Sequence, residues 1–597
     1  MASELLKRSE VREEDTWKTS DMYENTGAWE NELKEISALV DKAAAFEGKA
    51  AENADNLFVV LETLAKAGEK IEKAFNYAER LFDEDQTNTT HQAMSAKVYS
   101  LYAAMGSKTA FVDPEILAAS EETLEGFLKE KPELELYRKQ LAEIRRLKEH
   151  CLSAEMEKLL AMTAEMSQTP ADTFSILNNA DLVFPEIEDE NGEKVRITHG
   201  RYIQFVQSAD RRVRKDAFEK MYQTYKQYLN TLASLYSGNI KQQNFHAKAR
   251  KYASSLEAAV DENNVSPSVY YNLIDTVNKN LDKMHAYVAL RKKCLGLNEM
   301  HMYDIYTPMI PDMAKKIPFE EAKATVLKAL APLGEDYVNK VKEGFENRWI
   351  DVYENQGKRS GAYSAGAYGC HPYVLLNYNG TLDDMFTLAH EMGHALHSYF
   401  TWEKQPYLYS GHKIFVAEVA STCNEALLME YLLKTTEDKN MRKYLVNYFL
   451  EQFRGTLFRQ TMFAEFEKIT HEMAEKGEPL TWEGMNKIYH DLNRLYFGDD
   501  IVIDEEIDIE WARIPHFYNA FYVYQYATGY SAAIALSRKI LSEGQPAVDA
   551  YLDFLSKGDS EYSIDLLKGA GVDMSKKDAV ENAMAVFESL LDEMEKF

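Results

Sequence analysis

The chain has 597 residues, of which 45% are hydrophobic and 28% are charged, as is typical of globular proteins large enough for several domains. Its formal net charge of −29 argues against a nucleic acid partner, because the phosphate backbone would be repelled. No window approaches the roughly 18 consecutive apolar residues of a membrane-spanning helix, so no membrane partner is expected.

Cysteine usage and the N-terminus indicate the compartment. The four cysteines are scattered without a C-x-x-C pair, so we expect reduced thiols rather than disulfides. The first residues lack the apolar core of a signal peptide. Both features predict a cytoplasmic protein, and neither indicates its oligomeric state.

The first part of the chain is predicted to be helical. Residues that break helices are few, since the whole chain has 27 Gly and 14 Pro. From about residue 22 to residue 177 apolar residues recur at helical spacing, for example in 57–82 and 91–111. The pattern predicts an all-α fold class, predominantly helical with a few short β-strands or hairpins.

A β-hairpin is predicted to interrupt the helices at residues 182–202. Two runs of strand-forming residues flank Asn191-Gly192, a pair that favours the tight turn of a hairpin. Helical spacing resumes at Tyr202. We therefore predict an N-terminal helical region over residues 1–200 and a second, catalytic domain over residues 201–597.

A glycine-rich stretch at residues 359–380 precedes the most informative motif. Its second half, His371–Asn377, predicts a strand, because Tyr, Val and Leu dominate it. Such a strand could bind an extended peptide by adding it to the sheet, or it could be a purely structural edge strand. The stretch ends at Thr381, the expected N-cap of the helix that follows.

This helix contains His390, Glu391 and His394 in the order H-E-x-x-H. On a helix, histidines four residues apart lie on one face, so we predict both as ligands of one metal ion. Glu391 follows the first ligand and is placed to act as the general base. The similar run 471–475 lacks the second histidine, and we expect an ordinary charged helix surface there.

The third ligand must come from a later element. A catalytic zinc site usually has three protein ligands and one open position. The extended motif with a glycine and a third histidine is excluded, because His397 and Phe400 occupy those positions. Four glutamates follow as candidates: Glu403, Glu418, Glu425 and Glu430. Glu418 and Glu425 lie two turns apart on one face of a predicted helix, which suits one ligand and one supporting group.

A dense set of hydrogen-bond donors follows at residues 514–529. The donors are one histidine and several tyrosines: His516, Tyr518, Tyr522, Tyr524 and Tyr526. Metal-assisted hydrolysis of a carbonyl compound builds negative charge on the former carbonyl oxygen, and donors of this kind can stabilise that charge.

Four blocks of the sequence resemble the oligoendopeptidase F branch of the thimet-oligopeptidase-like metallopeptidases. They are the glycine-rich stretch, Ala389–Ser398, Phe415–Glu425 and residues 514–529. The resemblance covers most of the chain and is strongest from about Tyr202 onward. It implies a two-lobed helical zincin that encloses a deep substrate channel, with one Zn²⁺ per chain. It also implies an endopeptidase that cleaves internal bonds of short, unstructured oligopeptides.

The resemblance further implies roles for individual residues. The metal ligands that it implies are His390, His394 and Glu418. The base is Glu391, and a histidine and tyrosines of residues 514–529 stabilise the oxyanion. The tyrosine spacing is shorter than in the thimet-type relatives, and we favour, as the catalytic donors, His516, Tyr522 and Tyr524.

Two alternatives stay open from the sequence. One is a zinc metallocarboxypeptidase that removes single C-terminal residues. The other is a non-catalytic helical peptide-binding protein with a structural zinc ion, whose site would be closed by a fourth protein ligand. His397 is the candidate for that ligand, since it lies two turns after His390 on the same helix face.

Overall fold

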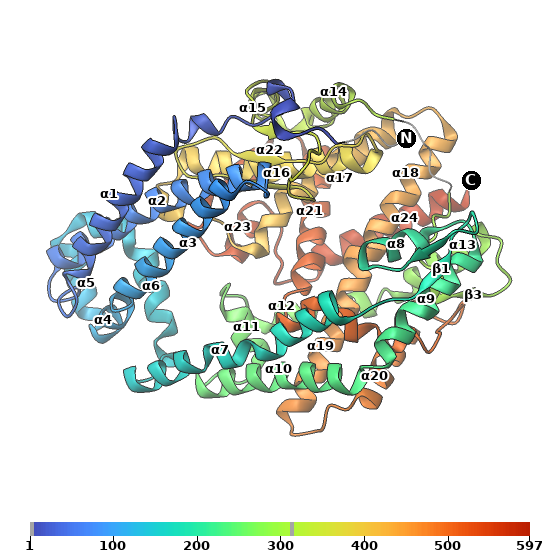
Figure 1. Ribbon diagram of the computed structural model, residues 1–597, viewed down its shortest axis with the longest axis horizontal. Coiled ribbons are helices and arrows are strands. Elements are labelled where there is room, and N and C mark those ends of the chain that lie inside the picture. The colour runs from blue at the N-terminus through green and yellow to red at the C-terminus, as the bar shows by residue number, and fades with distance from the viewer. Residues whose placement is uncertain (1–4, 311–315) are drawn as a thin grey trace. The chain divides into compact units, whose positions relative to one another are not determined.

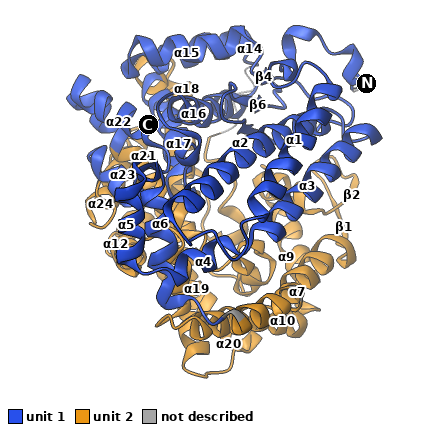
Figure 2. Cartoon of the chain, turned by 90° about the vertical axis from the view of Figure 1, so that its left-hand side faces the viewer, with its two compact units in different colours: residues 1–154, 314–431, 536–571 blue, residues 155–313, 432–535, 572–597 orange. Residues whose placement is uncertain are grey.

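The computed structural model describes residues 5–310 and 316–597, and the chain divides into two compact units (Figure 2). Unit 1 contains residues 1–154, 314–431 and 536–571. Unit 2 contains residues 155–313, 432–535 and 572–597. Because the segments of the two units alternate along the chain, they do not test the predicted division at residue 200, which stays a prediction.

Both units are built mainly from helices, which confirms the predicted fold class (Figure 1). Unit 1 contains α1 (Thr26–Ala44), α2 (Ala54–Glu84), α3 (Thr89–Thr109), α4 (Val112–Ala118), α5 (Glu121–Glu130), α6 (Arg138–Arg146), α14 (Phe319–Ala329), α15 (Glu335–Glu346), α16 (Leu382–Lys404), α22 (Gln545–Lys557) and α23 (Ser563–Gly569). Its strands are β4 (Ile350–Asp351), β5 (Tyr363–Ala365) and β6 (Tyr373–Leu375).

Unit 2 contains α8 (His199–Gln207), α9 (Arg211–Lys226), α10 (Leu229–Ala249), α11 (Ser255–Asp261), α12 (Pro267–Asn278), α13 (Leu281–Cys294), α18 (Lys439–Gln452), α19 (Arg459–Glu475), α20 (Trp482–Phe497) and α24 (Asp578–Glu595). Its strands are β1 (Glu186–Glu188), β2 (Lys194–Arg196), β3 (Met300–His301) and β7 (Ile501–Val502). The chain passes between the units within α7 (Ala154–Ile176), α17 (Ile414–Thr435) and α21 (Tyr524–Glu543).

Three long helices, α1, α2 and α3, pack side by side in unit 1 (Figure 1). Asn25 and Asn53 cap the first two, because each side chain accepts a hydrogen bond from a backbone N–H of the first turn. Trp17, Trp29 and Ile71 are among the buried residues of the core they form. The two helices predicted from spacing at 57–82 and 91–111 are therefore present.

The predicted β-hairpin is confirmed in unit 2. β1 and β2 pair antiparallel, with Ile187 opposite Val195. Gly192 has a φ of +82°, a backbone conformation that side chains other than glycine's rarely adopt. The Asp189 carboxylate accepts hydrogen bonds from the N–H groups of Asn191 and Glu193 and so fixes the turn.

A three-stranded sheet in unit 1 contacts α16. Its central strand is β6, which pairs parallel with β4 and antiparallel with β5. The strand predicted at His371–Asn377 is thus present, but its predicted role as an edge strand or as a site of peptide addition is wrong, since both its edges are occupied. The edge strands are β4 and β5, and β5 lies inside the glycine-rich stretch.

α16 and α17 approach each other closely in unit 1. Thr381 caps α16 as expected, since its hydroxyl accepts the N–H of Asp384. A Cβ atom on Gly393 would lie 2.5 Å from the Cα of Ser421 in α17, so only glycine fits there. Asn424 of α17 donates a hydrogen bond to the Ala389 carbonyl of α16 at 3.1 Å. The two helices are therefore in backbone contact.

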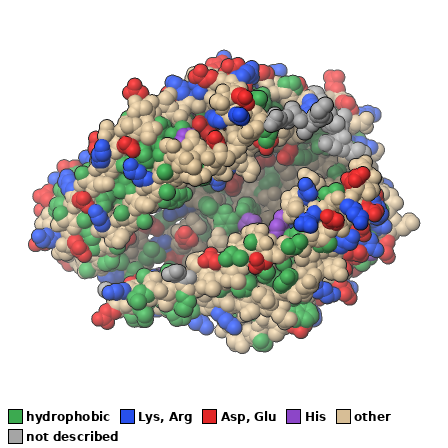
Figure 3. Space-filling model, viewed as in Figure 1, with side chains coloured by type: hydrophobic (Ala, Val, Ile, Leu, Met, Phe, Trp, Pro, Cys, Tyr) green, Lys and Arg blue, Asp and Glu red, His purple; other side chains and the backbone are tan. Residues whose placement is uncertain are grey.

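Acidic and basic side chains are interspersed among uncharged ones over the face shown in Figure 3. Within the described part of the chain, every helix is too short or too polar to cross a membrane.

The contact at Gly393 gives a test of the packing. Gly393→Ala forces the two helices apart, and we expect it to lower the free energy of unfolding by about 1–3 kcal/mol. Gly106→Ala is the matched control, because a Cβ there meets nothing within 4 Å, and it should stabilise α3 by about 0.5–1 kcal/mol. Denaturant unfolding of both variants measures the difference, and equal stabilities would contradict the close approach.

Candidate metal centre

Two histidines of α16 and one glutamate of α17 converge in unit 1. The Nε2 atoms of His390 and His394 are 3.2 Å apart. The Glu418 Oε2 atom lies 3.3 Å from the first of these nitrogens and 3.5 Å from the second. No other group of three potential ligands in the described residues comes this close together.

The residues present fit a tetrahedral metal ion. Ligand atoms at about 2.0–2.2 Å from such an ion lie about 3.3–3.6 Å from one another, which is the spacing seen here. Two imidazole nitrogens and a carboxylate oxygen are also the donor types that zinc prefers at catalytic sites. Glu418 keeps 43% of its side chain exposed, so the cluster is open on one side.

Glu425 fixes the orientation of His390. Its Oε1 atom accepts a hydrogen bond from Nδ1 of His390 at 2.6 Å. A proton held at Nδ1 leaves the lone pair of Nε2 free for a metal. The pKa of Glu418 is lowered although burial alone would raise it, because the imidazoles of His390 and His394 lie against its carboxylate. Glu418 is therefore ionised, as a ligand must be.

Glu391 lies next to the cluster in a different environment. Its side chain is only 6% exposed, and its Oε2 atom has no hydrogen-bond partner among the described residues. Burial raises the pKa of this carboxyl above its ordinary value. An unpaired buried oxygen beside three metal-ligand atoms is suited to accept a proton from a water molecule.

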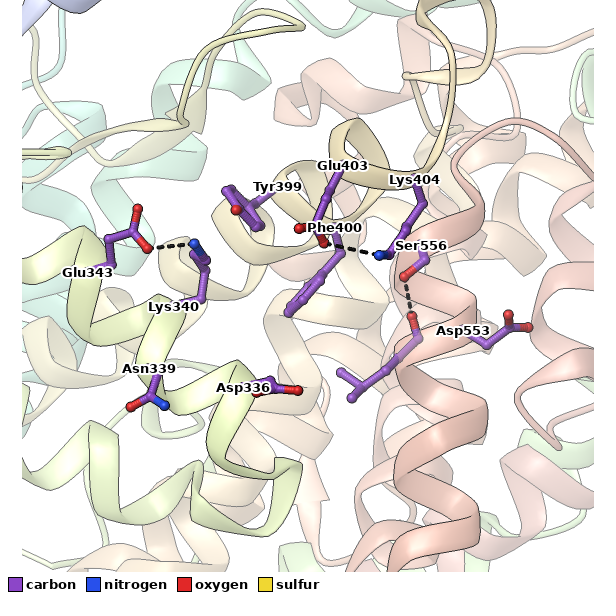
Figure 4. Close-up of a pocket in the computed structure, with 11 residues that line it drawn as sticks. Asp336, Asn339, Lys340, Glu343, Tyr399, Phe400, Glu403, Lys404, Asp553 and Ser556 are labelled. Atoms are coloured by element: carbon purple, nitrogen blue, oxygen red, sulfur yellow. Dashed lines mark hydrogen bonds and ion pairs between the residues drawn. The ribbon is translucent and has the colours of Figure 1, made fainter.

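The other candidates from the sequence lie elsewhere. Glu403 lines a separate crevice of about 570 Å³ in unit 1, where it pairs with Lys404 at 3.6 Å (Figure 4). Glu430 is not part of the cluster. His397, the candidate for a fourth ligand, is buried with its ring stacked on His412 at 4.2 Å. Among the described residues the cluster therefore contains only three protein ligands.

The predicted oxyanion donors belong to unit 2. The ring of His516 lies 6.3 Å from that of Tyr522 and 6.0 Å from that of Tyr526. Tyr524 is only 1% exposed and packs on Tyr270, with ring centroids 5.1 Å apart. Tyr522 thus lies beside His516, whereas Tyr524 lies in the core of unit 2.

The backbone before Tyr522 is strained. Phe521 has a φ of +53°, which is rare for an aromatic residue and costs about 1–3 kcal/mol. Glu467, fully buried in α19, accepts the Phe521 N–H at 3.0 Å and so holds this conformation. The ring of His471 lies 4.4 Å from that of Phe521.

The contacts of Glu467 and His471 with Phe521 were not predicted from the sequence. His471 is buried, so the charged helix surface predicted for this residue is wrong. Its Nε2 atom lies 2.7 Å from Gln243 Oε1 and its Nδ1 atom lies 2.8 Å from the Glu467 carbonyl oxygen, so both ring nitrogens have polar neighbours inside the protein. Glu467 carries no motif that could have identified it, because its partner is a backbone N–H from a distant segment.

Comparisons with known proteins identify peptidases along nearly the whole chain. The family model described as Peptidase family M3 matches residues 204–586, and the one described as Oligopeptidase F matches residues 115–184. The chain is 51% identical to oligopeptidase PepF of Bacillus subtilis over 595 residues, which is 100% of this chain and 89% of that protein. It is 41% identical over 588 residues to group B oligopeptidase PepB of Streptococcus agalactiae, with 98% of each chain covered.

Solved structures give the same result. The crystal structure of oligoendopeptidase-F from Enterococcus faecium matches with a TM-score of 0.75 at 40% identity, covering 95% of this chain and 98% of that one. A Chlamydophila abortus protein described as a peptidase matches with a TM-score of 0.92 at 37% identity, covering 99% of both chains.

The contact between Glu425 and His390 predicts an effect on metal affinity. Glu425→Ala removes the acceptor that orients the imidazole and should weaken metal binding about 10- to 100-fold. Glu425→Gln keeps an acceptor oxygen, so its loss of metal affinity should be much smaller. Competition with a metal chelator measures both affinities, and equal values for the Ala variant and the unaltered protein would contradict the role of Glu425.

Proposed function

The chain belongs to peptidase family M3, and from this premise we propose that it is a zinc-dependent endopeptidase that hydrolyses internal bonds of short, unstructured oligopeptides. The observation that carries the proposal is the convergence of His390, His394 and Glu418 beside the buried Glu391. Oligopeptidase is also the name of the relatives that match over nearly the whole chain.

Family membership implies a metal ion, and we propose one zinc ion per chain. His390, His394 and Glu418 would hold it, because their donor atoms are of the types and at the spacing that zinc requires. When bound, such an ion supplies Lewis acidity, which polarises a carbonyl group and makes a bound water more acidic.

Glu391 carries the proton transfer in this proposal. Its carboxylate takes a proton from the attacking water and passes it to the nitrogen of the leaving amine. Burial favours this role, because a raised pKa makes the carboxylate a stronger base than an exposed glutamate. Glu425 holds His390 in the orientation that keeps its Nε2 lone pair available.

Hydrogen-bond donors of unit 2 stabilise the developing oxyanion. We assign this role to His516 first and Tyr522 second, since their rings lie together on one segment. Tyr524 stays a predicted donor, but because it is buried in the core it is the least favoured of the three candidates.

Peptide binding is the third part of the proposal. The strand β5 contacts α16 and has one strand partner, β6, among the described residues, so an extended peptide could add to its other edge as a further strand. The enclosed channel that the resemblance implies would restrict substrates to short, unstructured peptides. Residues 201–597 contain every residue assigned here, in keeping with a catalytic domain of that extent, and we propose a cytoplasmic location.

The two alternatives are not favoured. A structural zinc site would need a fourth protein ligand, and His397 is stacked on His412 instead. A carboxypeptidase is tested directly with a peptide blocked at both ends. We expect internal cleavage of this peptide, and failure to cleave it would support removal of single C-terminal residues.

Substitution of Glu391 separates catalysis from metal binding. Glu391→Gln should lower kcat by about 10²–10⁴ because it removes the base. The metal content should stay at one ion per chain, whereas His390→Ala should lose the ion. Elemental analysis and turnover of an internally quenched peptide measure both effects. A Gln variant with nearly full turnover would contradict the assignment.

Substitutions in unit 2 test the oxyanion donors. His516→Ala and Tyr522→Phe should each lower kcat by about 10²–10³ with little change in KM, because the lost hydrogen bonds form only in the transition state. Tyr524→Phe decides whether the third predicted donor takes part. A loss of similar size would keep Tyr524 in the set, and an unchanged kcat would remove it.

A further inference from the structure

Unit 2 contains three groups in which two arginines pair with a single carboxylate. Three carboxylates are each shared by two guanidinium groups. Asp304 pairs with Arg211 at 2.9 Å and Arg214 at 2.8 Å, Glu451 with Arg291 at 2.6 Å and Arg454 at 3.0 Å, and Glu510 with Arg459 at 2.7 Å and Arg513 at 3.8 Å. Each set therefore carries one excess positive charge.

This local excess runs against the charge of the chain, which is −29. A buried charge without a close partner is costly, so each excess guanidinium should be satisfied by other groups or by a ligand. In the first two sets backbone carbonyls serve this purpose. Arg214 also donates to Ser208 O and Ala209 O, and Arg291 donates to Asp304 O and Thr307 O.

The third set is different. Arg459 donates to Glu510 Oε1, and the Tyr489 hydroxyl donates to Oε2 at 2.5 Å, so both carboxylate oxygens are used. Arg513 approaches the same Oε1 only to 3.8 Å, which is beyond hydrogen-bond distance. Its Nε atom is buried without a hydrogen-bond partner in the part of the chain that the structure describes.

Aromatic rings hold Arg513 in place. Its guanidinium lies 5.1 Å from the ring centre of Tyr202 and 6.0 Å from that of Tyr222. The side chain is still 19% exposed. Arg513 is thus a positioned, largely buried cation whose only paired carboxylate among the described residues is Glu510, 3.8 Å away.

Arg513 and the predicted oxyanion donor lie on one segment. The 3₁₀-helix Ile507–Arg513 leads directly into a second one, Pro515–Tyr518, which contains His516. Three residues span at most about 10 Å between Cα atoms. Burial lowers the pKa of His516, and the charge of Arg459 lowers it further, so the field of this set reaches the imidazole.

We propose that Arg513, together with Arg459, binds a carboxylate of the peptide substrate a few residues away from the scissile bond. The proposal rests on the proposed function, in which His516 contacts the reacting carbonyl. A guanidinium can bind a carboxylate through two parallel hydrogen bonds, which makes arginine suited to this recognition. The carboxylate comes either from the C-terminus of the peptide or from an acidic side chain near it.

Four internally quenched peptides of one sequence, all blocked at the N-terminus, distinguish these sources with the zinc-loaded protein. They combine a C-terminal acid or amide with Glu or Gln at the third residue after the cleavage site. We expect a roughly 10- to 100-fold lower KM for the peptides that carry the recognised carboxylate. Equal KM values for all four would overturn the proposal, and cleavage of none of them would instead overturn the proposed function.

Substitution of Arg513 assigns the preference to this residue. Arg513→Met should bring the KM ratio between the acidic and neutral peptides to about one. The change leaves Arg459 and Glu510 as a one-to-one pair, so the variant should fold, which a melting curve checks. If the Arg513→Met variant does not fold, Arg513→Gln, which keeps a polar side chain, is tested in its place.

Arg494→Met is the matched control, since Arg494 is an exposed arginine of α20 in the same unit. It removes the same charge and should keep both the activity and the KM ratio. A ratio that survives in the Arg513 variant, or that is lost equally in the Arg494 variant, would show that the preference does not come from Arg513.

Discussion

The backbone contact between α16 and α17 is the constraint on which the candidate metal centre depends. Because Gly393 has no side chain, Ser421 can lie against it. The turns of α17 just before and just after Ser421 then face the histidines of α16. Glu418 therefore contacts the Nε2 atoms of both imidazoles, and Glu425, two turns later, accepts a hydrogen bond from Nδ1 of His390. One neighbouring helix therefore supplies both the third donor and the group that orients the first.

Unit 2 uses a different device to place its side chains. The positive φ of Phe521 is unfavourable, and it persists because Glu467 binds the Phe521 N–H and the ring of His471 packs on the Phe521 ring. Burial raises the pKa of Glu467 well above its ordinary value, because desolvation disfavours the charged form of a buried carboxyl group. The residue that follows Phe521 in the chain is Tyr522.

The features that the residue pattern alone predicted correctly are local ones, whereas the choice of Glu418 as the partner of the two histidines came from the resemblance. Spacing of four residues suffices to place His390 and His394 together, and single residue types identify the cap Thr381 and the turn at Gly192. The errors concern contacts between distant segments. β6 became a central strand because β4, about twenty residues earlier in the chain, pairs with its second edge. His471 is buried because Gln243 and Phe521, which are distant in the sequence, contact its ring, and the local sequence pattern contains no information on such contacts.

Glu391 and Glu418 illustrate how one centre obtains two functions from the same residue type. Glu418 is partly exposed and lies against two imidazoles, which lower its pKa and keep it ionised as a donor. Glu391 is buried, and desolvation raises its pKa above the ordinary value, which makes its carboxylate a stronger base. Environments that move two pKa values in opposite directions separate the roles of ligand and base. Since α17 provides Glu418 and also covers α16 at Gly393, the same helix contact contributes to both environments.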